Sequence, residues 1–227
     1  MTGSHRDDPA IGGPREGTGN HAADRRVTAH HVRVPWIATY PEGETPEALR
    51  RQVLAAQDEA WPSDEDSAGG SLAPVHDPAL QPVSMLLVEG DTVVSALDVL
   101  FKQVEHAEWS LTAAGLSTVV TPLAHRGRGF GRMLVTHAYE AMPTFGVDLG
   151  LFTCDRPLMG FYAACGWEWL PGTVLVGGTP EEPFPSDSPG MDKVTFGAFF
   201  SPRAREARPA FLGARVLLHS GAIDRLW

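Results

Sequence analysis

A glycine- and arginine-rich segment has the composition of a phosphate-binding loop. It reads His-Arg-Gly-Arg-Gly-Phe-Gly over residues 125–131, directly before an amphipathic segment. Three glycines in five residues let the backbone turn sharply and expose successive N–H groups, and the positive end of a following helix also attracts an anion. Residues 122–139 carry three arginines and no acidic side chain. The spacing therefore predicts a site for a phosphate group, with a plain glycine turn into a helix as the alternative.

The segments before this loop are expected to form most of a sheet. Apolar, β-branched segments are separated by turns that contain glycine or acidic residues, which is typical of antiparallel hairpins. A capped amphipathic helix and a long loop precede these hairpins. The expected elements are a strand at 32–40, a helix at 46–60, a loop at 62–82, and strands at 83–88, 92–101 and 109–121.

After the loop, the apolar residues change from the alternation of a strand to the spacing of a helix. The expected elements are a helix at 130–142, a buried strand at 147–152, a short helix at 157–165, a strand at 167–176, a Pro- and Gly-rich loop at 177–190 and a last strand at 193–200. Residues 203–227 have a mixed pattern. The order of elements predicts one α/β domain with a mixed, mostly antiparallel sheet flanked by helices.

The composition is that of a soluble globular protein, with 43% hydrophobic and 20% charged residues in a chain of 227. The net charge of −10 disfavours nucleic acid and acidic membranes as partners and favours a cationic substrate, although it also serves solubility. Cys154 and Cys165 lack metal-ligand spacing and are expected to be buried free thiols. No segment suits a signal peptide or a membrane span, so we expect a cytoplasmic protein with a disordered tail at 1–26 and one domain at 27–227.

The loop and its surroundings resemble the GNAT acetyltransferase superfamily. Residues 126–131 match its Arg/Gln-x-x-Gly-x-Gly signature and fit neither a Walker nor a Rossmann motif. Upstream, Leu-Ser-Thr-Val-Val-Thr at 116–121 looks like the fourth strand of the family. Downstream, Phe-Tyr-Ala-Ala-Cys-Gly-Trp at 161–167 looks like its Phe-Tyr-x-x-x-Gly-Phe signature. The resemblance implies the GNAT fold, in which the fourth and fifth strands (here about 116–121 and 147–153) splay apart.

The resemblance also implies acetyl-CoA as co-substrate and no metal. The backbone of the fourth strand would pair with the pantetheine arm, and the amides of the loop would hold the pyrophosphate. The expected cofactor-binding residues are Val119, Val120, Thr121, Arg126, Gly127, Arg128, Gly129, Phe130 and Gly131.

Acetyl transfer to an amine requires a neutral amine, a stabilised oxyanion and a protonated or held thiolate. Tyr162 matches the family position that serves as general acid, and a phenol with a pKa of about 10 is mostly protonated at neutral pH. For the base, the sequence offers Asp98, Glu105, Glu108 or a water molecule. Asp98 is preferred because its neighbours on the strand are apolar. A core tyrosine and solvated surface carboxylates are the alternatives.

Within the superfamily, residues from about 83 onward look most like the aminoglycoside 2′-N-acetyltransferases. In that family, an acidic residue and the carboxylate of a terminal tryptophan grip the polycationic sugar, which implies substrate-binding roles for Asp224 and Trp227. The usual Gly-Asp-x-Trp ending is not matched here, and Ser117 stands where the family has its active-site acid.

The sequence therefore predicts an N-acetyltransferase that moves an acetyl group from acetyl-CoA to a primary amine of a small cationic molecule such as an aminoglycoside. The acidic residues 64–66, 181, 182 and 187 are expected to line a negative entrance. The alternatives are an acetyltransferase of protein N-termini or lysines and a non-catalytic module that binds acyl-CoA. A homodimer stays open.

Overall fold

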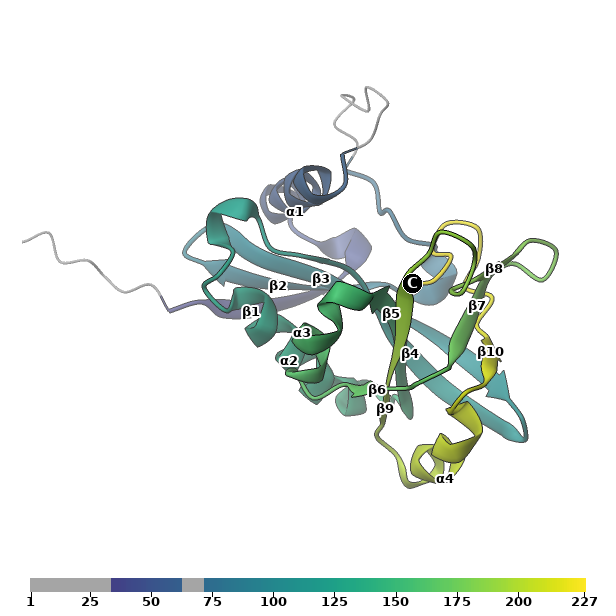
Figure 1. The fold of residues 1–227 in the computed structure, drawn as a ribbon. Helices are drawn as coiled ribbons and strands as arrows, with labels where there is room; N and C mark the ends of the chain where they lie inside the picture. Colours follow the sequence, from purple (N-terminus) through teal and green to yellow (C-terminus); the bar gives the residue numbers. More distant parts are fainter. Residues whose placement is uncertain (1–33, 63–71) are drawn as a thin grey trace, which may run out of the picture. The chain divides into compact units, whose positions relative to one another are not determined.

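A seven-stranded mixed sheet is the frame of the domain (Figure 1). The computed structural model describes residues 34–62 and 72–227. The expected tail at 1–26 and the acids at 64–66 lie outside these residues. The strand order is β1-β2-β3-β4-β5-β9-β6, and only β4 and β5 are parallel neighbours. The bounds are β1 (Trp36–Pro41), β2 (Val83–Glu89), β3 (Thr92–His106), β4 (Trp109–Val120), β5 (Leu149–Asp155), β6 (Glu168–Trp169) and β9 (Lys193–Phe199).

Helices cover both faces of this sheet, because its strands are apolar on both sides. On β2, Met85 and Leu87 pack with the apolar side of α2, whereas Leu86 and Val88 pack with α1 on the opposite face. The bounds are α1 (Glu47–Ala60), α2 (Phe130–Ala141), α3 (Met159–Ala163) and α4 (Pro202–Phe211), with short 3-10 turns η1 (Glu42–Glu44), η2 (Pro78–Leu80), η3 (Leu123–His125), η4 (Met142–Phe145) and η5 (Arg156–Leu158). The expected α/β architecture is confirmed.

The C-terminal third differs from the expected pattern. The predicted strand at 167–176 is two strands, since Pro171 and Gly172, with a φ of 73°, turn the chain between β6 and β7. The predicted loop at 177–190 contains β8, and residues 202–217 form α4 and β10. A second sheet results, in the order β10-β7-β8, from β7 (Val174–Gly178), β8 (Pro183–Pro185) and β10 (Arg215–Leu217).

The predicted splay between the central strands is confirmed. β4 and β5 pair only at Ala113 with Leu149 and at Ala114 with Gly150, after which the two strands separate. β4 also contains a bulge, because its register with β3 shifts by one residue between Ala96 and Asp98. Thr118 lies in this bulge with a φ of 47°, which is rare for a β-branched residue. The point beyond Ala114 where β4 and β5 separate, called the fork below, lies a few residues from the bulge on the same strand.

Candidate active site

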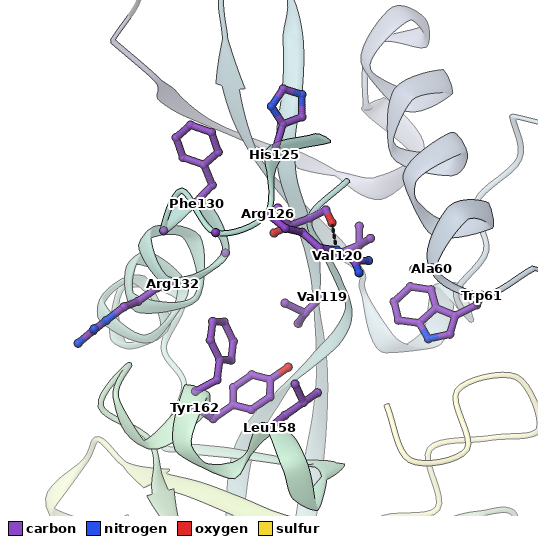
Figure 2. A pocket seen from close by; sticks show the side chains of 15 residues that line it. Ala60, Trp61, Val119, Val120, His125, Arg126, Phe130, Arg132, Leu158 and Tyr162 are labelled. Carbon is purple, nitrogen blue, oxygen red and sulfur yellow. Dashed lines mark hydrogen bonds between the residues drawn. The ribbon is translucent and has the colours of Figure 1, made fainter. Parts of the chain in front are cut away.

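A pocket of about 610 Å³ lies beside the end of β4 (Figure 2). Its walls come from four segments: the end of α1, the end of β4, the glycine-rich turn into α2, and the segment that contains η5 and α3. All the predicted cofactor-binding residues except Arg128 line it. Arg128 instead lies over the Phe130 ring, with its guanidinium carbon 4.4 Å from the ring centre, and contacts Glu89 at 3.3 Å.

The glycine-rich turn has the geometry of an anion site. Gly127 and Gly129 have φ values of 75° and 83°, which favour glycine, and a Cβ on either would point into open space. Gly129 caps α2, whose first-turn N–H groups lack helical partners and face the turn. A Cβ on Gly131 would lie 3.0 Å from the Thr121 hydroxyl oxygen, so a glycine there lets α2 approach β4 closely.

A hydrogen bond closes the turn on β4. The Arg126 side chain donates through Nε to the carbonyl oxygen of Thr121 at 2.9 Å, which is the dashed line in Figure 2. The bond brings the arginine beside the end of β4, so its charge lies at the pocket rim. Trp61 lines the same rim from the end of α1 and is 54% exposed.

Tyr162 lies at the inner end of the pocket, with its hydroxyl pointing into it (Figure 2). The ring is 6% exposed and packs edge-on against Phe152 and Phe161, with centroid separations of 4.9 and 5.0 Å. Burial raises the pKa of Tyr162 well above its usual range, and the nearby Cys154 adds to the effect. No described residue hydrogen-bonds its hydroxyl. Tyr162 therefore stays protonated at neutral pH with a donor available to a ligand.

Both cysteines are buried and free, as expected. Burial raises the pKa of the Cys154 thiol to about 12 and also raises that of Cys165. Neither thiol is therefore a nucleophile at neutral pH, since the thiolate is the reactive form.

Asp98 lies on the α1 side of β3 and is 1% exposed. Its Oδ1 accepts from the Ser84 hydroxyl at 2.5 Å, and its Oδ2 contacts the Thr118 hydroxyl at 2.5 Å and His76 Nε2 at 3.2 Å. Burial alone would raise the pKa of Asp98, but His76, Ser84 and Thr118 outweigh it and lower the pKa. Both carboxylate oxygens are thus occupied, an arrangement that stabilises the ion and leaves little affinity for a further proton.

Asp224 comes to the same cluster from the C-terminal segment. Its Oδ1 lies 2.6 Å from His76 Nδ1, and its Oδ2 accepts from the backbone N–H of Asp77 at 2.9 Å. Because the two aspartates bind opposite nitrogens of the ring, the three side chains do not converge on one point. The described residues hold no group of three or more His, Cys, Asp or Glu side chains that could bind a metal ion.

His76 is the member of this cluster that sequence reasoning missed. It lies in the segment expected to be a long loop, and a single histidine between Pro74 and Pro78 has no periodicity or motif that would mark it. The residue is 4% exposed, so it belongs to the interior even though its backbone has no helix or strand.

Trp227 packs beside the fork of β4 and β5. A Cβ on Gly115, the first β4 residue past the paired positions, would lie 2.7 Å from three atoms of the Trp227 indole. Across the fork, a Cβ on Gly150 would lie 2.5 Å from the Trp167 ring. Each glycine therefore leaves space for one tryptophan. The Trp227 Nε1 is buried and has no hydrogen-bond partner among the described residues.

The other predicted acids lie away from the bulge. Glu105 and Glu108 are exposed at the hairpin between β3 and β4, at the opposite end of those strands. Asp187 binds Arg215 at 2.7 Å, and neither it nor Glu181 and Glu182 line the pocket.

Comparison with known proteins assigns this architecture to a family. Residues 37–170, more than half of the chain, match the model described as "Acetyltransferase (GNAT) domain". No curated protein sequence matches. The fold is similar to that of the Escherichia coli GNAT family N-acetyltransferase YhbS in complex with CoA, with 18% identity over 82% of this chain and 89% of that chain and a TM-score of 0.53.

Two further solved structures match at lower scores. They are E. coli ElaA, 14% identical over 72% of this chain and 99% of that chain with a TM-score of 0.48, and an acyl-CoA N-acyltransferase from Pseudomonas aeruginosa, 14% identical over 72% and 99% with a TM-score of 0.47. None of the helices within residues 34–62 and 72–227 has the length and apolarity that crossing a membrane requires. With its forked sheet, its glycine-rich turn and the family match over residues 37–170, the chain belongs to the GNAT acetyltransferase family.

Proposed function

We propose that this acetyltransferase moves an acetyl group from acetyl-CoA to the primary amine of a small cationic molecule. The observation that carries the proposal is that one pocket collects three features: the end of β4, the glycine-rich turn of α2, and the Tyr162 hydroxyl. The first two suit the pantetheine arm and the pyrophosphate of the donor. The third is a buried proton donor at the end where a thioester would lie.

The residues present fit coenzyme A. The left-handed glycines at 127 and 129 leave open space where side chains would otherwise stand, and the N-terminus of α2 faces that space. The fork leaves the β4 edge that faces β5 without a partner strand beyond Ala114, so an extended ligand can pair with this edge at Val119. The Val120 carbonyl oxygen already accepts from the Ser95 hydroxyl at 3.0 Å. Arg126 and Arg132 line the pocket and offset phosphate charge.

The chemistry follows from these positions. The amine nitrogen attacks the thioester carbonyl carbon, the C–S bond breaks, and the product is an amide. Tyr162 donates its proton to the departing sulfur and regains one from the water that takes up the amine proton, so the buried phenol is neutral again at the end of the cycle. The amides near the bulge of β4 stabilise the oxyanion. None of the residues that line the pocket is acidic. We therefore propose that water accepts the amine proton, because Asp98 is saturated with donors.

A cationic acceptor fits the local charge. Asp98 and Asp224 carry two negative charges and His76 one positive charge, so the buried cluster has a net charge of −1 and touches Thr118 beside the pocket. An ammonium group that approaches on this side of the sheet is attracted. Aminoglycosides and polyamines both meet this requirement. Protein N-termini and lysines remain the second candidate class.

The test is a thiol-release assay in which acetyl-CoA is offered with aminoglycosides, polyamines and peptides side by side. We expect release with at least one small polycation and much less with peptides. The Tyr162→Phe variant is the matched control, since it keeps the ring and removes only the hydroxyl. Binding of acetyl-CoA without thiol release for any amine would overturn the proposal in favour of a non-catalytic acyl-CoA-binding module.

A further inference from the structure

His76 connects three parts of the chain that are far apart in sequence. It lies 22 residues before Asp98 on β3 and 148 residues before Asp224 in the C-terminal segment. The exposed fractions are 4% for His76, 1% for Asp98 and 7% for Asp224. Three ionisable side chains are therefore enclosed together, and the acetyl-transfer chemistry described above uses none of them directly.

At neutral pH the three side chains of this cluster keep constant charges, with a protonated His76 between two aspartates. Burial disfavours the charged imidazole, but the hydrogen bonds to Asp224 and Asp98 outweigh it and raise the pKa of His76 to about 10. At neutral pH the ring is thus an imidazolium that donates from both nitrogens. A proton relay would need a group that readily gains and loses a proton near the working pH, and a histidine held charged on both sides does not meet that need.

One end of the cluster holds the bulge of β4. Thr118 donates its hydroxyl to the same Asp98 oxygen that His76 contacts, at 2.5 Å. The left-handed backbone of Thr118 is strained for a β-branched side chain and persists only where the surroundings hold it. The next two residues, Val119 and Val120, line the pocket. The orientation of their peptide groups therefore depends on the Asp98 contact.

The other end of the cluster holds the C-terminal segment 224–227. Asp224 is bound by His76 and by the backbone of Asp77, and three residues later Trp227 packs on Gly115 beside the fork. Leu226 is buried in the same apolar cluster as the second sheet. The Arg225 carbonyl oxygen also accepts from the Gly178 N–H and the Ser220 hydroxyl, both at 3.0 Å, but these bonds tie the segment to the second sheet and to its own loop. If Asp224 were released, the segment would therefore lose its polar tie to β3, and the indole would be held there by apolar contacts alone.

We propose that His76 is a positioning residue for acetyl transfer, which fastens segment 224–227 to β3 and holds the bulge of β4 at the pocket. The proposal rests on the proposed function for its catalytic consequence, while its structural content stands on the described contacts. It assigns Asp224 to a structural contact with His76 rather than to a substrate, and Asp98 to support of Thr118. Under this proposal, Trp227 lies at the fork and bounds the space in which the acceptor amine binds, called the acceptor side.

The test compares His76→Gln with His106→Gln. Glutamine keeps polar atoms but cannot hold a charge between two carboxylates. His106 is a suitable control because it is half-buried, bonds the Ala210 carbonyl oxygen at 2.8 Å, and lies at the far end of β3. Hydrogen exchange of the backbone amides is followed in residues 116–121 and 218–227. We expect faster exchange in both segments for His76→Gln and wild-type exchange in both for His106→Gln.

Kinetics separate a positioning role from a general loss of folding. Turnover is measured with spermidine, or with kanamycin where spermidine gives none, and acetyl-CoA affinity by calorimetry. Since misplacement by about 1 Å lowers turnover by roughly a hundredfold, we expect a fall in kcat of about tenfold to a hundredfold. The acetyl-CoA Kd should change much less than kcat, because the glycine-rich turn that suits the pyrophosphate does not contact His76 and only the contacts at Val119 and Val120 are affected. Unchanged exchange in either segment, or an unchanged kcat, would overturn the proposal.

A second variant covers the case in which His76→Gln does not fold. Asp224→Asn keeps the shape of the side chain and removes one charge, so segment 218–227 should exchange faster while residues 116–121 change less. Equal exchange of segment 218–227 in this variant and in the wild type would also overturn the proposal. Absence of acetyl transfer in the wild-type chain would count against the proposed function alone, since the exchange measurements need no acceptor.

Discussion

Gly115→Ala is a direct test of the place of Trp227. An added Cβ would lie 2.7 Å from Cδ2, Cε2 and Nε1 of the indole. Because non-bonded carbon atoms pack at about 3.5–4.0 Å, the ring has to move by roughly 1 Å. Over-packing of this kind lowers the free energy of unfolding by about 1–3 kcal/mol. The φ of Gly115 is not positive, so alanine is compatible with the strand and by itself favours folding by about 0.5–1 kcal/mol.

The two effects have opposite signs and can be separated in a double-mutant cycle. In the wild-type background, Gly115→Ala should lower the free energy of unfolding, measured by urea denaturation, by up to about 2 kcal/mol. In a Trp227→Ala background the clash is absent, so the same change should be neutral or stabilising by about 0.5–1 kcal/mol. The expected coupling between the two sites is therefore about 1–3 kcal/mol.

Gly160→Ala is the matched control for this cycle. Gly160 lies in α3 without a positive φ, and a Cβ there would meet nothing within 4 Å. It should therefore have the same effect in both backgrounds. If Gly115→Ala destabilises the protein equally with and without the Trp227 side chain, the indole does not pack on Gly115 and the wall assigned to the acceptor side is wrong.

Three further predictions concern the pocket and the buried cluster. Tyr162→Phe should lower kcat by about a hundredfold or more with little change in acetyl-CoA Kd; unchanged turnover would rule out the acid role. Gly129→Val should weaken acetyl-CoA binding by about tenfold or more, because valine at a φ of 83° is strained and its side chain enters the phosphate space; wild-type affinity in calorimetry would refute the loop assignment. The folded pKa of His76 is raised from 6.5 to about 10, so its stabilisation is complete below pH 6.5 and is lost as the pH rises towards 10. Urea midpoints should fall over that range in the wild type and fall less in His76→Gln, and parallel pH profiles would contradict this reasoning.

Features that depend on neighbouring residues could be predicted from the sequence. The glycine-rich turn was identified because it needs left-handed backbone at 127 and 129, and only local composition decides that requirement. The strand that contains Met85–Val88 was identified because an apolar segment that ends at a turn of acidic residues and glycine is typical of an antiparallel hairpin. By contrast, the strand predicted at 167–176 was wrong, since a turn at Gly172 sends its second half into another sheet. Its β-branched residues suit either sheet equally.

The functional residues divide in the same way. The sequence by itself determined the family, the glycine-rich turn and the place of Tyr162 beside it, because each is a motif of adjacent residues. It also marked Asp98 and Asp224 as candidates without their partner. Only the tertiary structure decided which partner these acids share, since His76 joins them across 22 and 148 residues of chain. A buried charge is stable only beside its counter-charges, and their positions are a property of the folded chain. Local pattern therefore indicates the glycine-rich turn, whereas only long-range packing brings His76, Gly115 and Trp227 to their places in the fold.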